Sequence, residues 1–377
     1  MNKVFEKKIG LVLPGGGARA AYQVGVLRAI NEIMGDRNPF AIISGTSAGA
    51  INASLLASRS ESLKEAVEVL SNVWGNFKTE KVYRTDTTMM LKSILKWLLT
   101  ISSLGVLAKY PESLLDNSPL RELLLETINI EAIKNNIDQG NLNAFAITAA
   151  SYSSKNSVTF FQSQQNDLNW ERFLRVGVET DIGIDHLMAS IALPLIFPAV
   201  KINNEYFGDG AMRQATPLSP AIRLGAEKLL IITTDLKSPV NQLTDNQIYP
   251  SIGEVGGYML DALFTGGLLS DLERLDRINQ IIENSESNPV QTSTKKMKYL
   301  EYCVISPSKD IKKVAKEHYK DAPYSINLLM KGLGLKNRDN SELLSFLLFE
   351  SSFTSSLIEL GFEDGMAKQS EIESIVG

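Results

Sequence analysis

The chain has 377 residues, of which 44% are hydrophobic, so it can bury a sizeable core in one large domain or two ordinary ones. Its formal net charge of −5, without any long block of Lys or Arg, argues against nucleic acid as a partner, because phosphate binding needs a concentrated positive surface. Cys303 is the single cysteine, which excludes an intrachain disulfide, and its apolar surroundings predict a buried strand.

The N-terminus is charged and leads directly into an apolar run. It lacks the apolar segment and the cleavage site of a secretory signal. We therefore expect a cytoplasmic protein. Peripheral contact with a membrane is expected as well, because of the apolar segment Met89–Leu107. Export by a route that needs no signal leaves no mark in a sequence and stays open.

Two strand–turn–helix units open the chain. Ile9–Leu13 is an apolar run that ends in Gly15-Gly16-Gly17, and apolar residues then recur at helical spacing. Phe40–Ser44 is a second apolar run, followed by a glycine turn and a helix from Ala48 to about Ala57. Two such units in succession predict a parallel sheet in an α/β fold.

Later segments predict further strands for the same sheet. The candidates are Asn143–Ala150, Val158–Gln162, Lys228–Thr234, Tyr299–Ile305 and a hairpin over Ala199–Phe207 that turns at Asn203-Asn204. A helix is predicted over Ser118–Thr127, with Ser118 as its cap and Pro119 in its first turn. The polar stretch Glu283–Lys296 predicts an exposed loop, and the pattern beyond Pro307 is helical.

The most apolar segment of the chain is Met89–Leu107. Lys92 and Lys96 interrupt it, so it falls short of the roughly 20 apolar residues that a spanning helix needs. We expect a core helix here. The alternative is a lid or a membrane-surface helix whose lysines reach water.

The pentapeptide Gly45-Thr46-Ser47-Ala48-Gly49 matches G-x-S-x-G and lies between a predicted strand and a predicted helix. This is the context of a nucleophile elbow, in which Gly45 and Gly49 leave room for a strained serine. A helix that begins at Ala48 directs free N–H groups toward Ser47 and favours developing negative charge there. A plain tight turn is the alternative.

The triple glycine Gly15-Gly16-Gly17 also joins a strand to a helix. Consecutive glycines leave backbone N–H groups free to bind an anion, so this turn is a candidate oxyanion hole beside the elbow. Gly15-x-Gly17-x-x-Ala20 also fits a relaxed dinucleotide fingerprint. However, the next strand ends at Ser44 without the acidic residue that would hold a ribose.

A serine nucleophile needs a base, and the chain has only two histidines, His186 and His318. His318 follows Ser47 and Asp209 in the order of α/β-hydrolases, which leaves a triad open. The charged residues around His318 nevertheless predict a solvated helix face. His186 abuts an apolar stretch and is expected to serve core packing or to support the site indirectly.

Asp209 is the better candidate for the base. It ends the second strand of the predicted hairpin and is followed by Gly210-Ala211, so its carboxylate can approach another backbone closely. An ordinary Asp-Gly turn at a strand end is the alternative.

Four blocks of the sequence, in this order and spacing, resemble the patatin-like phospholipase family across about residues 8 to 235. They are Pro14–Arg19 with Tyr22–Leu27, Gly45–Gly49, Ala189–Pro194 with Phe197-Pro198, and Asp209-Gly210-Ala211. Ala20 and Ala211 stand where other members have glycine.

The resemblance implies a three-layer α/β/α fold with a mainly parallel central sheet, followed by C-terminal helices. It divides the chain into a catalytic domain over 1–306 and a helical extension over 307–377 packed on it. It also implies a Ser-Asp dyad without a catalytic histidine, and neither a cofactor nor a metal. The implied site residues are Ser47 and Asp209 as nucleophile and base, Gly15, Gly16, Gly17 and Arg19 for the oxyanion hole, Gly45, Thr46, Ala48 and Gly49 in the elbow, and Gly210 and Ala211 in the base motif.

The function implied is hydrolysis of acyl esters in a lipid or lysolipid, of the phospholipase A or lysophospholipase type. Two alternatives stay open. One is acyl transfer from the same dyad to an alcohol, and the other is a lipid-binding or interaction protein of hydrolase fold that needs an activator.

Overall fold

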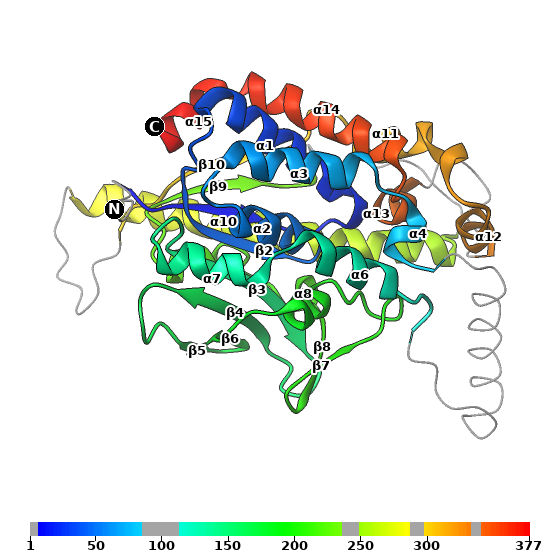
Figure 1. The fold of residues 1–377 in the computed structure, drawn as a ribbon, viewed down its shortest axis with the longest axis horizontal. Coiled ribbons are helices and arrows are strands. Elements are labelled where there is room, and N and C mark those ends of the chain that lie inside the picture. Colours follow the sequence, from blue (N-terminus) through cyan, green and yellow to red (C-terminus); the bar gives the residue numbers. More distant parts are fainter. Residues whose placement is uncertain (1–6, 85–112, 236–248, 287–297, 333–340) are drawn as a thin grey trace.

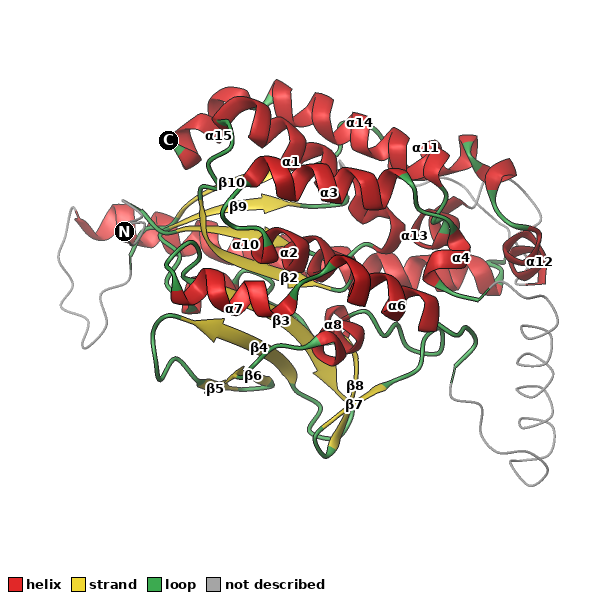
Figure 2. Cartoon of the chain, viewed as in Figure 1, coloured by secondary structure: helices red, strands yellow, loops and turns green. Residues whose placement is uncertain are grey.

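The computed structural model describes residues 7–84, 113–235, 249–286, 298–332 and 341–377. A ten-stranded sheet crosses the molecule, with helices on both of its faces (Figures 1 and 2). The predicted segment Met89–Leu107 lies outside the described residues.

The strands of the sheet follow the order β10-β9-β1-β2-β3-β4-β6-β5, and β8 pairs with β3 while β7 pairs with β8. Neighbours from β10 to β3 are parallel, whereas β4 and β8 run antiparallel to β3. The strands are β1 (Ile9–Leu13), β2 (Phe40–Thr46), β3 (Ala144–Ser151), β4 (Ser157–Ser163), β5 (Trp170–Arg172), β6 (Arg175–Glu179), β7 (Val200–Ile202), β8 (Glu205–Asp209), β9 (Lys228–Ile232) and β10 (Glu301–Ile305).

Helices make up most of the remaining described structure, and the helical pattern beyond Pro307 is confirmed. They are α1 (Ala21–Met34), α2 (Ala48–Ser58), α3 (Leu63–Gly75), α4 (Thr79–Val82), α6 (Ser118–Thr127), α7 (Ile130–Asp138), α8 (Ile184–Ser190), α9 (Ser219–Arg223), α10 (Ile252–Glu286), α11 (Ile311–Glu317), α12 (Tyr324–Gly332), α13 (Ser341–Leu347), α14 (Ser351–Ala367) and α15 (Gln369–Val376), with short 3-10 turns η1 (Gly17–Ala20), η2 (Gly210–Met212) and η3 (Tyr319–Asp321). In the part of the chain that the structure describes, no helix is both long enough and apolar enough to cross a membrane.

Successive side chains of the central strands point to opposite faces of the sheet, so one core forms on each face. Leu11 and Leu13 of β1 face the larger core, which α1, α2 and α14 cover, while Val12 faces the smaller core under α9 and α10. This is why the parallel strands are apolar throughout and do not alternate in polarity. Cys303 on β10 is buried, as predicted, and burial raises its thiol pKa to about 11.

The predicted strands and the hairpin turn at Asn203 are confirmed, with ends shifted by a few residues. β5 and β6 were not predicted, because they are short and half-exposed and carry no clear alternation. The residue before α6 is Asn117, so Ser118 is the first helical residue and not the cap.

The expectation of a loop from Glu283 is wrong for its first residues, since α10 continues to Glu286. The side chain of Asn279 lies near the end of α10. It donates to Leu300 O at 2.9 Å and accepts from Leu300 N at 3.1 Å, which ties the end of the helix to the segment before β10. The remainder of that stretch lies outside the described residues.

The C-terminal helix α14 lies along α1 (Figure 1). Glycines allow the two backbones to touch. A Cβ added at Gly25 would lie 1.9 Å from Ile358 O, and one at Gly361 would lie 2.1 Å from Tyr22 O. The division of the chain into 1–306 and 307–377 stays a prediction, but residues on either side of it share one core.

We expect Gly25→Ala and Gly361→Ala each to destabilise the fold by about 2 kcal/mol or more, because the added methyl forces the helices apart. Thermal or urea unfolding measures the loss. Gly256→Ala in α10 is the matched control, since nothing lies within 4 Å of the added carbon. Equal stability of Gly25→Ala and Gly256→Ala would contradict the close helix contact.

Candidate active site

The register of the sheet brings Ser47 and Asp209 together. Thr46, the last residue of β2, lies opposite Thr148 on β3, and Asp209, the last residue of β8, lies opposite Ala149. Ser47 Oγ therefore lies within reach of the aspartate and donates to Asp209 Oδ2 at 2.6 Å. The two predicted residues meet although 162 positions separate them in the sequence.

Ser47 occupies the strained turn that the elbow motif predicted. Its φ of 53° and ψ of −132° are rare for a residue with a side chain. Neighbouring groups hold this conformation: Ser47 N donates to Ser190 Oγ at 2.9 Å, and Ser190 Oγ donates to Thr148 O at 2.7 Å. Ser190 belongs to the block that precedes Asp209, but no pattern in the sequence indicated this bond.

The glycines of the elbow are needed for space. A Cβ at Gly49 would lie 2.1 Å from Leu13 O, and one at Gly45 would lie 2.6 Å from Ala50 Cα. Ala48 begins α2, and the N–H of a first helical residue has no acceptor within the helix. The positive end of α2 thus lies directly beside the serine hydroxyl.

Asp209 is fully buried, and its environment controls its charge. Burial raises its carboxyl pKa to about 7, against the opposing effect of hydrogen bonds from Ser47 and from Ala211 N, the latter at 2.9 Å. Gly210 permits the turn, because a Cβ there would lie 2.1 Å from Thr148 O. The carboxyl group is therefore able to exchange a proton near neutral pH.

The triple glycine turn adjoins the nucleophile. A Cβ at Gly15 would lie 2.8 Å from Ser47 Cβ and 2.6 Å from the ring of Phe264. Gly17 has a φ of 55°, and a Cβ there would lie 2.3 Å from Phe346 O. The predicted oxyanion turn and the elbow are thus in contact, with the two glycine segments at the ends of adjacent parallel strands.

A family model for patatin-like phospholipases matches residues 11–222, which is more than half of the chain. The chain belongs to the patatin-like phospholipase family. A stretch of 56 residues, 15% of the chain, is 51% identical to lysophospholipase nte1 of Aspergillus terreus (strain NIH 2624 / FGSC A1156) and spans 4% of that protein.

Two solved structures are similar over 98% of this chain. VipD from Legionella pneumophila has 12% identity, a TM-score of 0.36 and 68% of its own chain covered. Human GIVD cytosolic phospholipase A2 has 11% identity, a TM-score of 0.48 and 60% of its own chain covered.

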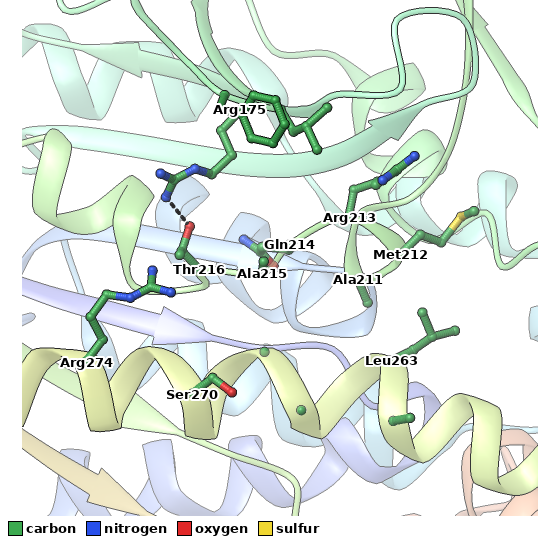
Figure 3. A pocket seen from close by; sticks show the side chains of 15 residues that line it. Arg175, Ala211, Met212, Arg213, Gln214, Ala215, Thr216, Leu263, Ser270 and Arg274 are labelled. Carbon is green, nitrogen blue, oxygen red and sulfur yellow. Dashed lines mark hydrogen bonds between the residues drawn. The ribbon is translucent and has the colours of Figure 1, made fainter.

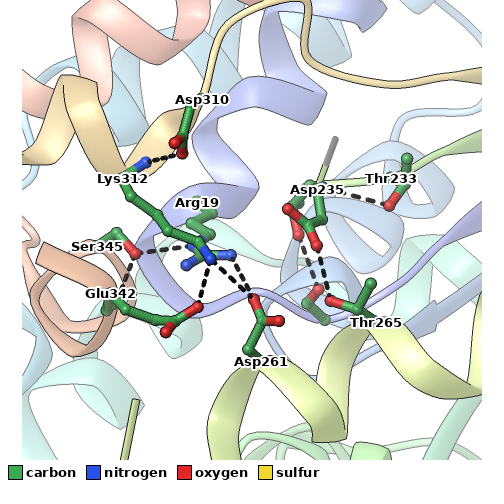
Figure 4. A network of polar contacts seen from close by, with 11 residues as sticks. Arg19, Thr233, Asp235, Asp261, Thr265, Asp310, Lys312, Glu342 and Ser345 are labelled. Carbon is green, nitrogen blue, oxygen red and sulfur yellow. Dashed lines mark hydrogen bonds and ion pairs between the residues drawn. The ribbon is translucent and has the colours of Figure 1, made fainter. Parts of the chain in front are cut away.

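In this patatin-like chain, Arg19 is buried and points toward the C-terminal helices (Figure 4). Its Nε donates to Ser345 Oγ at 2.8 Å, its guanidinium lies 3.7 Å from the centre of the Phe346 ring, and its Nη1 lies 3.5 Å from Asp261 Oδ1. Arg19 therefore joins the glycine turn to α13 and α10. Its influence on an oxyanion stays a prediction.

Residues of α13 and its C-terminal neighbours cover the site, which the sequence did not indicate. They help to enclose an apolar cavity of about 30 Å³ beside Ser47, lined by Gly17, Ser47, Ala48, Ile51, Phe77, Val82, Leu120, Ile191, Leu193, Phe197, Phe346, Leu347 and Phe349. Only 3% of the Ser47 surface is exposed. An ion pair between Lys312 Nζ and Glu342 Oε1 at 2.5 Å further anchors α13.

Neither histidine contacts the Ser47–Asp209 pair within the described structure. His318 lies beside α14, where its ring nitrogens lie 3.1 Å from Asp321 Oδ2 and 3.0 Å from Ser356 Oγ. It is half-buried, whereas the sequence predicted a solvated position. His186 accepts from Gly183 N at 3.0 Å at the start of α8, and burial lowers its pKa.

The raised pKa of Asp209 predicts a pH-dependent stability. A carboxyl whose pKa rises on folding contributes stability that is present below the unfolded value, near 4, and lost as pH rises through about 7. We expect Asp209→Asn to gain stability over the wild type between pH 5 and pH 8, on the order of 2 kcal/mol. Urea unfolding at both pH values measures it, with Asp167→Asn at an exposed loop as control. If the difference in unfolding free energy between Asp209→Asn and the wild type were the same at pH 5 and pH 8, the raised pKa would be contradicted.

Proposed function

We propose that this chain is a lipid acyl hydrolase in which Ser47 attacks a carboxylic ester and Asp209 accepts the serine proton. The observation that carries the proposal is the 2.6 Å hydrogen bond from Ser47 Oγ to a buried carboxylate, at the positive end of α2. Family membership supports hydrolysis of a lipid, and the short match to a protein named lysophospholipase agrees with it.

The proposed reaction has two steps. As Ser47 Oγ bonds to the ester carbonyl carbon, its proton passes to Asp209, and the carbonyl oxygen becomes an oxyanion. The glycine turn and the N–H of Ala48 are the donors proposed for that oxyanion. The C–O bond to the alcohol then breaks, and the alcohol leaves with the proton held by Asp209. Water repeats the sequence on the acyl-enzyme and releases the fatty acid.

A carboxyl pKa of about 7 suits this double role. The group can accept a proton from serine and return it to the leaving alcohol without a large penalty in either direction. An ordinary exposed aspartate would hold its proton too weakly. Burial of Asp209 therefore substitutes for the imidazole of a triad.

We expect Ser47→Ala and Asp209→Asn each to lower kcat by about 1000-fold or more on a panel of phospholipids, lysophospholipids and short esters, because nucleophile and base act as one unit. Released fatty acid and deacylated lipid are quantified by mass spectrometry. Adding a long-chain alcohol shows whether the acyl group is also transferred.

His318→Ala is the control for that experiment, and it should retain a rate close to that of the wild type, since His318 lies beside α14. Thermal unfolding confirms that each variant is folded. Loss of turnover in folded His318→Ala, with only a modest loss in Asp209→Asn, would overturn the dyad.

The cavity beside Ser47 must enlarge to take an acyl chain. Its volume of about 30 Å³ suits little more than a water molecule, whereas ligand pockets usually hold 300 Å³ or more. Phe346, Leu347 and Phe349 lie in and just after a short helix, whose anchors are the polar contacts of Arg19 and Lys312. These side chains are therefore the ones proposed to move.

We expect Phe346→Ala to raise the ratio of kcat/KM for a long-chain ester to that for a short-chain ester by about 10-fold. In the wild type, the buried Phe346 ring must move before a long acyl chain can enter, and the variant lacks this ring. Steady-state kinetics on esters that differ only in acyl length give the ratio. Phe353→Ala is the matched control, since Phe353 is buried in α14 but does not line the cavity. An equal ratio in both variants would contradict the role of Phe346.

A further inference from the structure

A second and larger cavity opens beside the base motif. It is a groove of about 660 Å³ formed by the turn between β5 and β6, the segment 211–216 and one face of α10 (Figure 3). Its lining includes the three arginines Arg175, Arg213 and Arg274, and none of the described residues that line it is Asp or Glu. The lining is thus positively charged, although the net charge of the chain is −5.

Two of these arginines approach Thr216 from opposite sides of the groove, while Arg213 is directed away from them in this view (Figure 3). Arg175 Nη1 donates to Thr216 Oγ1 at 2.6 Å, which fixes the position of one guanidinium. Arg274 on α10 remains 58% exposed and leaves most of its donors facing solvent. The groove therefore holds one guanidinium fixed by a hydroxyl and a second that is largely exposed to solvent.

One acid, Asp271, lies beside this pair and interacts with both guanidinium groups, which leaves two positive charges against one carboxylate. Asp271 is buried, accepts from Leu218 N at 3.0 Å and lies 3.8 Å from Arg274, the long end of the range for an ion pair. Positive charge continues beyond the groove with Arg223, whose pKa is lowered first by burial and then by the nearby charges of Arg172 and Arg175. The local charge balance thus favours an anion.

The groove and the small apolar cavity adjoin the Ser47–Asp209 pair through different residues. Ala211, which lines the groove, donates its N–H to Asp209, and Gln214, which also lines it, accepts from Thr46 Oγ1 at 2.6 Å next to Ser47. Gly17 and α2, in contrast, line the cavity. A glycerophospholipid has the same polarity about its scissile ester, with an acyl chain on one side and a phosphate on the other.

We propose that the groove between Arg175 and Arg274 binds the phosphate group of the lipid substrate. The proposal rests on the proposed lipid acyl hydrolase function and adds the site on this chain that would hold the phosphate of the substrate. Guanidinium groups suit phosphate oxygens because their planar N–H donors match two oxygens at once. Phe173, which is 88% exposed at the rim, adds an apolar contact suited to an amphiphile.

The test compares a lysophosphatidate with a monoacylglycerol of the same acyl chain, which differ only by the phosphate. In Arg175→Gln/Arg274→Gln, the ratio of kcat/KM for the lysophosphatidate to that for the monoacylglycerol should fall by about 10-fold to 100-fold, because charge-assisted bonds to phosphate are lost. Arg274→Lys should keep part of the preference, since it keeps the charge but not the planar donors.

Arg277→Gln is the matched control. Arg277 is exposed on the same helix, pairs with Glu273 at 3.2 Å and does not line the groove, so its loss should leave the ratio unchanged. Thermal unfolding of the double variant checks its folding. Should it be unfolded, Arg274→Gln alone takes its place, because this side chain is 58% exposed and its ion pair with Asp271 is long, at 3.8 Å. An unchanged ratio in the folded variant would overturn the proposal.

A second arm separates a lipid headgroup from free phosphate. Inorganic phosphate and glycerol 3-phosphate are titrated into Ser47→Ala protein by calorimetry, a measurement that does not depend on turnover. Glycerol 3-phosphate should bind more tightly than inorganic phosphate, and both should lose affinity in the triple variant that also carries Arg175→Gln and Arg274→Gln. Tighter binding of inorganic phosphate, without any phosphate preference in turnover, would overturn the headgroup assignment.

Failure of the proposed function gives a different result. In that case the wild type hydrolyses neither ester, while glycerol 3-phosphate still binds to the arginine groove. The opposite case is that the wild type hydrolyses both esters with equal kcat/KM and binds neither phosphate compound. This result would overturn the phosphate site in the groove but not the proposed hydrolase function.

Discussion

Burial of the Asp209 carboxylate is the constraint on which the site depends. An ionised carboxylate without exposed surface is costly, and here the hydroxyl of Ser47 and the N–H of Ala211 are the donors that offset the cost. Both donors require close backbones, which explains the glycine at position 210 and the strained conformation of Ser47. The same burial raises the carboxyl pKa to about 7, so one physical cause sets both the geometry and the acid–base behaviour.

The register of the sheet places Ser47 and Asp209 next to each other. β2 runs parallel to β3, whereas β8 runs antiparallel to β3 just past the end of β2. Two chain segments therefore end beside one another from opposite directions, one carrying Ser47 and the other Asp209. Ser190 secures the junction, because its hydroxyl bonds to both Ser47 N and Thr148 O.

The C-terminal helices take part in the site as well as in the core. α14 packs along α1 through glycines, and this places α13 across the glycine turn, where Arg19 bonds to Ser345 and stacks on Phe346. The cover over Ser47 thus depends on contacts made by residues more than 320 positions away from the glycine turn. The arginine groove beside the base motif is larger than this covered cavity and is lined by three arginines.

The sequence by itself determined the features that depend on neighbouring residues. Apolar runs and glycine turns predicted the central strands and the elbow at Ser47, because turn chemistry is local, while the pairing of Ser47 with Asp209 was implied by the resemblance of the ordered motifs to a family. Tertiary structure decided the rest: the bond of Ser190, the direction of Arg19, the cover by Phe346 and the meeting of Arg175 with Arg274. These contacts join residues far apart in the chain, and no local pattern records a partner that only the packing of the sheet and its helices brings within reach.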